Sequence, residues 1–187
     1  MTRRSAELVT PNLAGKLVCL RAWRPGEGAA LEPACGDEGI CRFTTVPRAY
    51  SALDAEAWIA RQERRRIAGE AIVLAINERG TARPVGMVGL FGLDSPDHSG
   101  RLGYWLIRAW RGRGLARDAV GLLASWAFRE LPLRVLHIDI ESANSASRRL
   151  AEALGAQPIG SLHRDLLNEE VALTRFILTE RTPPTQA

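Results

Sequence analysis

The chain has 187 residues, a length that suits one compact domain with its own hydrophobic core. Apolar residues make up 46% and charged residues 25% of the sequence, which excludes disordered and fibrous chains. The net charge of +4 comes from scattered arginines, without the aromatic-interleaved basic stripe of nucleic-acid-binding proteins. We therefore expect a single domain over residues 1–187, with its core over 14–180, flexible ends and no nucleic-acid partner.

Cysteine usage and apolar runs restrict the location of the protein. The three cysteines form no Cys-x-x-Cys pair, and no histidine stands at metal-ligand spacing from them or from another histidine. The first residues lack the apolar run of a secretion signal, and no stretch is long enough to span a bilayer. The sequence thus predicts a cytoplasmic protein with free thiols, no bound metal and no membrane partner.

The first half of the chain predicts a strand, a helix and a hairpin. Residues 16–24 alternate between apolar and polar types and end at a Pro-Gly turn, which indicates a strand. Residues 54–68 show helical spacing, with Ser51 or Asp54 as the expected N-cap. Two apolar runs, 71–77 and 85–93, flank a polar turn and predict an antiparallel hairpin.

The second half predicts alternating strands and helices. A strand over 102–107 leads through a glycine-containing turn into a helix over 115–131, which Pro132 closes. A strand over 135–140 and a helix over 145–154 follow, and then two strands, 158–162 and 171–179, around a polar bend. The expected fold is α/β (α+β), with a mixed, mostly antiparallel sheet of about six to seven strands flanked by helices.

The turn before the helix at residue 115 is the most informative segment. The first N–H groups of a helix have no intrahelical partner, and the helix dipole adds partial positive charge there. Gly112 and Gly114 allow close approach of an anion, and Arg111 and Arg113 add charge. The segment lacks the Gly-Lys-Ser/Thr of a P-loop and the third glycine of a dinucleotide fingerprint. It favours a phosphate site, with a solvated flexible turn as the alternative.

Two motifs carry a family resemblance. Arg111, Gly114 and Ala116 match the Gln/Arg-x-x-Gly-x-Gly/Ala loop, so the run resembles motif A of the GNAT acetyltransferases. Asn144 and Ser147, followed by a glycine at 155, are similar to a motif of the branch that includes the ribosomal-protein alanine acetyltransferases. The resemblance covers all but the termini. It implies the GNAT fold and transfer of an acetyl group from acetyl-CoA to a primary amine.

The resemblance also implies where the coenzyme binds. The strand over 102–107 and the next strand should separate, so that the pantetheine arm lies between them. The implied contacts come from the backbone of the strand over 102–107, from the phosphate loop with the start of the helix after it, and from the start of the helix over 145–154. They are Tyr104, Leu106, Ile107, Arg111, Gly112, Arg113, Gly114, Leu115, Ala116, Asn144 and Ser147.

Amine acetylation needs a base for the ammonium proton and an acid for the leaving thiolate. The resemblance implies Ser147 as the acid, and Asn144 and Ser147 have a helix-capping role as the alternative. Glu170 is the favoured base by resemblance, and Glu141 at a strand end is the second candidate. The alternative for both is a solvated surface glutamate without a catalytic role. His163 is a third candidate. Arg101 stands where the branch often has an acidic residue, which excludes a carboxylate base there.

The acceptor stays open at this stage. A protein N-terminal amine and a small-molecule amine are both compatible, while residues 35–53 and 163–170 lack the run of carboxylates expected for a polycationic aminoglycoside. A non-catalytic acyl-CoA-binding sensor or scaffold of the same fold is the alternative function. The sequence leaves a homodimer open.

Overall fold

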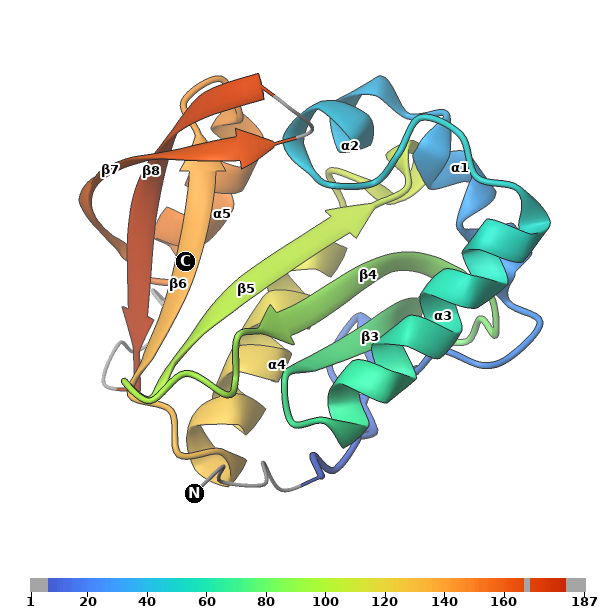
Figure 1. Ribbon diagram of the computed structural model, residues 1–187, viewed down its shortest axis with the longest axis horizontal. Coiled ribbons are helices and arrows are strands. Elements are labelled where there is room, and N and C mark those ends of the chain that lie inside the picture. The colour runs from blue at the N-terminus through green and yellow to red at the C-terminus, as the bar shows by residue number, and fades with distance from the viewer. Residues whose placement is uncertain (1–6, 167–168, 181–187) are drawn as a thin grey trace.

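A computed structural model describes residues 7–166 and 169–180, with side chains for all of these except 164–166, 169 and 170. One eight-stranded sheet, in the order β1-β2-β3-β4-β5-β6-β8-β7, forms the centre of the molecule (Figure 1). The strands are β1 Leu13–Ala14, β2 Val18–Ala22, β3 Ala71–Glu78, β4 Pro84–Phe91, β5 Ser99–Leu106, β6 Val135–Glu141, β7 Gln157–Leu166 and β8 Glu169–Thr179. The helices are α1 Glu32–Cys35, α2 Glu38–Phe43, α3 Ala52–Ile67, α4 Leu115–Glu130 and α5 Ser145–Ala153, with 3-10 turns η1 Gly28–Ala30 and η2 Arg108–Trp110.

The sheet has one irregular junction, between β5 and β6. Neighbouring strands from β1 to β5 pair antiparallel, and β6, β8 and β7 continue in the same manner. β5 and β6 are parallel, and their register ends with Arg101 opposite His137, after three pairs. Beyond this point the two strands diverge, as Figure 1 shows.

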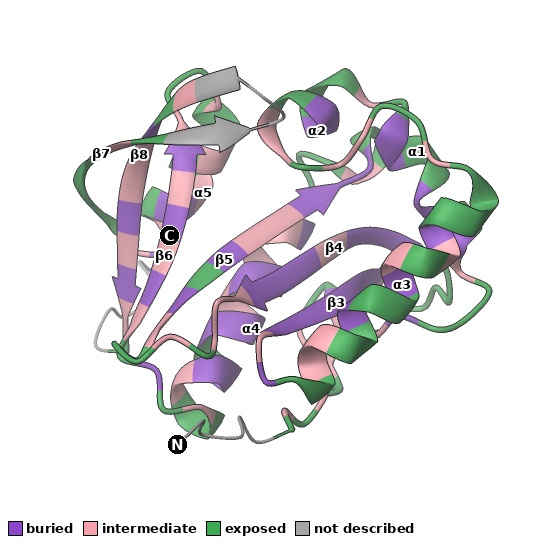
Figure 2. Cartoon of the chain, in the orientation of Figure 1, coloured by how far each residue is buried: buried purple, intermediate pink, exposed green. Residues whose placement is uncertain are grey.

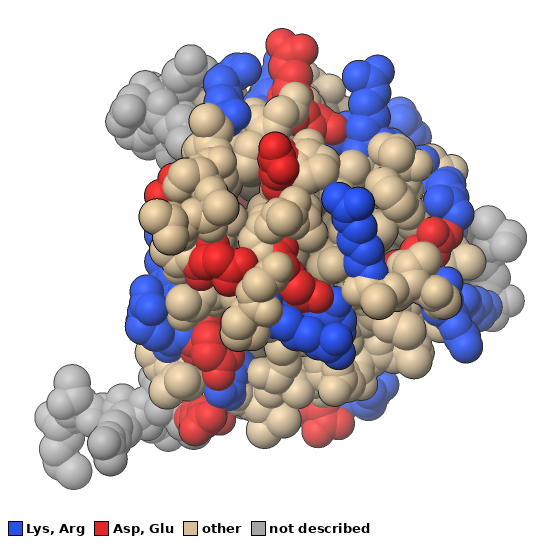
Figure 3. Space-filling view, turned by 90° about the vertical axis from the view of Figure 1, so that its right-hand side faces the viewer, with Lys and Arg blue, Asp and Glu red and all other residues tan. Residues whose placement is uncertain are grey.

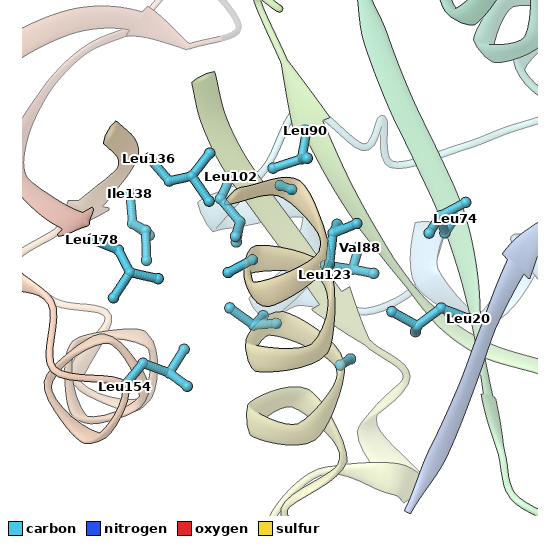
Figure 4. Packing of buried hydrophobic residues seen from close by; sticks show 14 of the residues in the cluster. Leu20, Leu74, Val88, Leu90, Leu102, Leu123, Leu136, Ile138, Leu154 and Leu178 are labelled. Carbon is cyan, nitrogen blue, oxygen red and sulfur yellow. The ribbon is translucent and has the colours of Figure 1, made fainter. Parts of the chain in front are cut away.

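Two hydrophobic clusters cover the two faces of the sheet. The larger one joins the sheet to α4 and α5 and includes Leu102, Leu106 and Leu123 (Figure 4). The smaller one joins the other face to α1 and α3, and Trp105 belongs to it. Since successive strand side chains point to opposite faces, β5 contributes even-numbered residues to the first cluster and odd-numbered ones to the second. Figure 2 shows β3 and β4 buried between these layers, with the outer side of α3 exposed.

Local side-chain interactions fix the start of two helices. Ser51 and Asp54 form a capping box at the start of α3, because the Ser51 hydroxyl accepts from Asp54 N at 3.1 Å and the Asp54 carboxylate accepts from Ser51 N at 3.0 Å. In the first turn of α4, Asp118 accepts from Leu17 N at 2.7 Å and from Val18 N at 3.1 Å. These bonds hold the N-terminal end of α4 against β2.

The fold class predicted from the sequence is confirmed, with eight strands in place of six to seven. The additional strand is β1, whose two residues are too few for a periodic pattern. The bend expected over residues 163–170 is mostly strand, since β7 runs to Leu166 and β8 starts at Glu169. Antiparallel pairing between β7 and β8, with His163 opposite Ala172, satisfies the backbone of this segment and overrides its polar composition.

Two parts of the chain differ from the rest in how the sequence could be compared with the structure: the termini and the segment between β2 and α3. Residues 1–6 and 181–187, predicted to be flexible, lie outside the described residues. The segment between β2 and α3 contains η1, α1 and α2, which are too short to give a helical pattern. Within the described ranges, no helix combines the length and apolar character needed to cross a membrane.

The larger cluster predicts where stability is concentrated. Leu123 on α4 is fully buried in it, so Leu123→Ala should lower the free energy of unfolding by about 2–5 kcal/mol through lost burial and a cavity. Leu53→Ala on α3, where the side chain is 83% exposed, is the control and should change it by less than about 0.5 kcal/mol. Urea unfolding measures both, and equal effects would contradict this assignment of the core.

Candidate active site

A cavity of about 990 Å³ opens where β5 and β6 diverge. Its lining combines Tyr104 and Leu115 from the α4 side of the sheet with Trp58 and Trp105 from the α3 side. Because residues of both faces contribute, the cavity passes through the gap between the two strands. A ligand bound on one side can therefore meet a ligand bound on the other.

The loop between β5 and α4 presents backbone N–H groups to this cavity. Gly112 and Gly114 have φ values of 74° and 78°, a region that glycine adopts without steric cost. Gly114 is the N-cap of α4, and no side chain among the described residues caps it. The first hydrogen bond in this turn runs from Asp118 N to Gly114 O, at 3.1 Å. The N–H groups of Leu115 and Ala116 precede this bond and have no acceptor within the helix, a geometry that permits an anion site; the site itself stays a prediction from the sequence.

Arg111 is held in place by the protein itself. Its Nε donates to the carbonyl of Leu106 at 2.8 Å, and its Nη2 forms an ion pair with Asp37 at 2.7 Å. Burial raises the pKa of the Asp37 carboxyl, but the hydrogen bond and charge of Arg111 outweigh this effect and hold the pKa below its usual value. Asp37 also caps α2 by accepting from Ile40 N at 3.0 Å. One carboxylate thus joins the phosphate loop to α2.

Arg113 also has a carboxylate partner. It forms an ion pair with Glu78 at the end of β3, and Glu78 also accepts from Trp110 Nε1 at 3.3 Å. Glu78 therefore fixes the turn before α4. Both guanidinium groups that the sequence places beside the anion site are paired, so the uncapped N–H groups of the helix are its main free donors.

The backbone of β5 turns alternate residues toward the gap. Ile107 N donates to Val85 O on the β4 side at 3.0 Å. In an extended chain the N–H and C=O groups of successive residues point in opposite directions, so those of Leu106 and Tyr104 face β6. The backbone groups of Tyr104 and the N–H of Leu106 therefore face the gap, whereas the Leu106 carbonyl already accepts from Arg111 Nε and the Ile107 N–H is bonded to Val85.

Two hydroxyl groups meet across the cavity. The Tyr104 hydroxyl on β5 lies 2.8 Å from Ser147 Oγ on α5. Burial raises the pKa of the Tyr104 hydroxyl and the Ser147 hydrogen bond only partly offsets it, so Tyr104 stays protonated near neutral pH. Asn144 Oδ1 accepts from Ser147 N at 3.1 Å, which makes Asn144 the cap of α5. The Ser147 side chain is thereby left to interact with Tyr104.

The candidate bases have different positions. Glu141, the last residue of β6, lines the cavity and pairs with Arg42 of α2 at 3.2 Å. Glu170 is the second residue of β8, but its side chain lies outside the described part of the chain. His163 is an exposed residue of β7 and does not line the cavity. Arg101 lines the cavity from β5, on the face opposite to Tyr104. The structure thus brings Glu141, Tyr104 and Ser147 to one cavity.

Asp139 is a cavity residue that the sequence analysis missed. Its side chain is 5% exposed and accepts two hydrogen bonds from Arg175 of β8, at 2.7 and 2.9 Å. The hydrogen bond to Asp139 raises the pKa of Arg175. The alternation His-Ile-Asp-Ile-Glu in β6 could have revealed this residue, because Ile138 and Ile140 face the core and leave Asp139 and Glu141 on the other face.

These features agree with comparisons to known proteins. Residues 18–157 match the family model described as "Acetyltransferase (GNAT) domain". The chain belongs to the GNAT acetyltransferase family. One curated relative, the putative ribosomal N-acetyltransferase YdaF of Bacillus subtilis (strain 168), is 33% identical over 70 residues, which are 37% of this chain. That alignment spans 38% of the length of YdaF.

Solved structures of other proteins have the same fold. A putative ribosomal-protein-serine acetyltransferase from Vibrio cholerae superimposes with a TM-score of 0.78 at 22% identity, over 93% of this chain and 99% of that one. Mycobacterium smegmatis RimJ, solved with CoA-disulfide, gives 0.81 at 17% identity over 95% and 90%. The microcin C7 self-immunity acetyltransferase MccE, solved with acetyl-CoA and AMP, gives 0.79 at 16% identity over 88% and 93%.

The Asp37–Arg111 ion pair in this GNAT domain yields a pH prediction. Asn can still cap α2, so Asp37→Asn removes mainly the ion pair and should lower the free energy of unfolding by about 1 kcal/mol at pH 7. The folded-state pKa of Asp37 is lowered, so this contribution is present above the usual value of 3.8 and is lost as the pH falls through the folded-state value.

The measurement is chemical denaturation of wild type, Asp37→Asn, Arg111→Ala and the double variant between pH 3 and pH 7. Non-additive effects at pH 7 that become additive in acid are expected from a direct pair. Additivity at every pH would show that Asp37 and Arg111 do not interact.

Proposed function

We propose that this protein transfers an acetyl group from acetyl-CoA to a primary amine by direct attack of the amine on the thioester. The observation that carries the proposal is the divergence of β5 and β6 beside the uncapped N-terminus of α4. Membership in the GNAT family and the coenzyme-bound complexes of similar folds support it.

The diphosphate of the coenzyme binds in this proposal to the N–H groups of the loop and first turn of α4, from Gly112 to Ala116. The pantetheine arm then lies in the gap, where it takes the place of the missing strand partner for the backbone groups of Tyr104 and the N–H of Leu106. The thioester reaches the part of the cavity lined by Ser147 and Glu141.

In the chemical step, the amine nitrogen attacks the thioester carbon and the bond between carbon and sulfur then breaks. The proton of the attacking amine passes to the Glu141 carboxylate, directly or through a water molecule. The Ser147 hydroxyl donates a proton to the leaving sulfur, and Tyr104, a protonated neighbour at 2.8 Å, orients it. Ser147 then regains a proton from water through Tyr104, and Glu141 releases its proton to water, which restores the starting state. Glu170 stays a prediction from the resemblance.

The roles of the Ser147 and Tyr104 hydroxyls, called the hydroxyl pair below, are tested with Ser147→Ala and Tyr104→Phe. Ser147→Ala should lower kcat by about 100-fold or more, because a positioned acid contributes that much, while Kd for acetyl-CoA stays within about threefold. Tyr104→Phe should lower kcat less. Ser145→Ala is the matched control, since Ser145 begins the same helix, is exposed and does not line the cavity.

Release of the coenzyme A thiol with a panel of amines measures turnover, and calorimetry measures binding. Unchanged kcat in Ser147→Ala would refute the assigned acid. Tight binding of acetyl-CoA without turnover on any amine would indicate a sensor or scaffold instead of an enzyme.

The phosphate loop is tested with Gly112→Ala. The alanine forces a residue with a Cβ into φ 74°, which costs about 1–2 kcal/mol and distorts the anion site, so coenzyme A should bind about tenfold more weakly. Gly36→Ala is the control, because Gly36 has φ −83° and equally open surroundings. Equal coenzyme affinity in the two variants would exclude the loop as the binding site.

A further inference from the structure

The α3 side of the cavity has the features of a binding site for an anionic acceptor. We define the α3 pocket by six cavity residues, which are Tyr50, Trp58, Arg61, Gln62, Arg65 and Trp105. It lies on the face of the sheet opposite to α4, and therefore opposite to the coenzyme site proposed above. An amine bound there would approach the thioester through the gap between β5 and β6.

Two cations in the α3 pocket have little local compensation. Arg61 and Arg65 lie one turn apart on α3 and so share one side of the helix. Arg65 stacks over Phe91 at 5.4 Å and is 3.5 Å from the exposed Glu70, a weak surface ion pair. Arg61 lies beside the Tyr50 hydroxyl and has no carboxylate partner within the described ranges.

The two carboxylates of described residues that line the cavity already have arginine partners within the protein. Asp139 is bound by Arg175, and Glu141 by Arg42. The outer surface near α3 carries both signs of charge, as Figure 3 shows, so the excess of cations is particular to the cavity and not to the whole face. An anion in the α3 pocket would meet Arg61 and Arg65 without displacing a carboxylate of the described residues from Arg61.

Two buried polar atoms in the pocket also need a partner. Trp105 Nε1 and Gln62 Oε1 have no hydrogen-bond partner in the part of the chain that the structure describes, although Trp105 is 4% and Gln62 7% exposed. Leaving such a group unsatisfied costs about 1–3 kcal/mol. Both atoms are closed to solvent, so a ligand would reach the indole N–H as a donor, or Gln62 Oε1 as an acceptor, only after the pocket wall moves; Gln62 Nε2 is held by Trp58 O at 3.3 Å.

The size and walls of the pocket favour a small acceptor. Trp58 and Tyr50 provide aromatic surface, and Trp58 is fixed edge-on against Trp23 with ring centroids 5.6 Å apart. On the same side, α2 is tied to the phosphate loop through Asp37 and to β6 through Arg42. These two ties hold α2 over the cavity, which leaves less room for a protein chain than for a small molecule.

We propose that the acceptor is a small amine with an aromatic or apolar body and an anionic group, a carboxylate or a phosphate, which binds to Arg61 and Arg65. This inference rests on the proposed acetyltransferase function. It names the acceptor class, whereas the coenzyme site and the hydroxyl pair do not depend on it.

The test compares three amines of similar shape in the coenzyme A release assay: phenethylamine, L-phenylalanine and tyramine O-phosphate. We expect kcat/KM to be at least about tenfold higher for an anionic amine than for phenethylamine, and the better of the two identifies the anion. Arg61→Ala and Arg65→Ala should remove this preference through KM, so that kcat/KM for the anionic amine falls to the value for phenethylamine in the same variant. Arg64→Ala is the matched control, because Arg64 lies on the same helix but does not line the cavity.

Equal use of all three amines, or a preference that persists in Arg61→Ala and Arg65→Ala, would overturn the inference. Faster acetylation of an acidic peptide N-terminus than of any small amine would overturn the proposal that the acceptor is a small molecule. Calorimetry of the coenzyme-A-bound protein with N-acetylphenylalanine and N-acetylphenethylamine gives a readout without turnover. If no amine is acetylated but the anionic ligand binds tighter in an Arg61-dependent manner, the proposed function fails while the anion site stands.

Discussion

The structure depends on one strand edge that is left open. β5 is paired with β4 up to Leu106, but with β6 only up to Arg101, so its remaining N–H and C=O groups on that side have no strand partner. Buried backbone groups need hydrogen bonds, and an open edge inside a sheet is therefore a binding site for another extended, amide-containing chain. A contact from Arg111 Nε to the Leu106 carbonyl closes the end of this edge. In the proposed function, this edge receives the pantetheine arm of the coenzyme.

The open edge is stable because surrounding contacts fix both sides of it. Asp118 holds α4 to β2, Glu78 holds the turn before α4, and Asp37 holds Arg111. On the other side of the gap, Arg175 binds Asp139 and connects β6 to β8. These contacts set the width of the gap before any ligand binds, which is the preorganisation that catalysis by positioning requires. The charges that look like ligand-binding groups in the sequence serve mainly this structural purpose.

The sequence predicted much of the fold, because long elements repeat their pattern over many residues. The helix over 115–131 and the strands around it were recognisable from periodicity, and the uncapped turn at Gly114 from its glycines. What the sequence could not show was pairing at a distance. The Arg111–Asp37 pair joins residues far apart in the chain, α1 and α2 are too short for a pattern, and Tyr104 and Ser147 meet only because β5 and α5 lie on opposite sides of the gap.

The central claim is that main-chain N–H groups at the start of α4 bind the diphosphate of coenzyme A. Its most direct test is a titration of ¹⁵N-labelled protein with coenzyme A, followed by the backbone amide resonances. We expect the largest shifts at residues 112–116, with smaller shifts at Tyr104 and Leu106, and a return to the starting positions when the ligand is removed. Saturable binding with unchanged resonances at 112–116 would contradict the account.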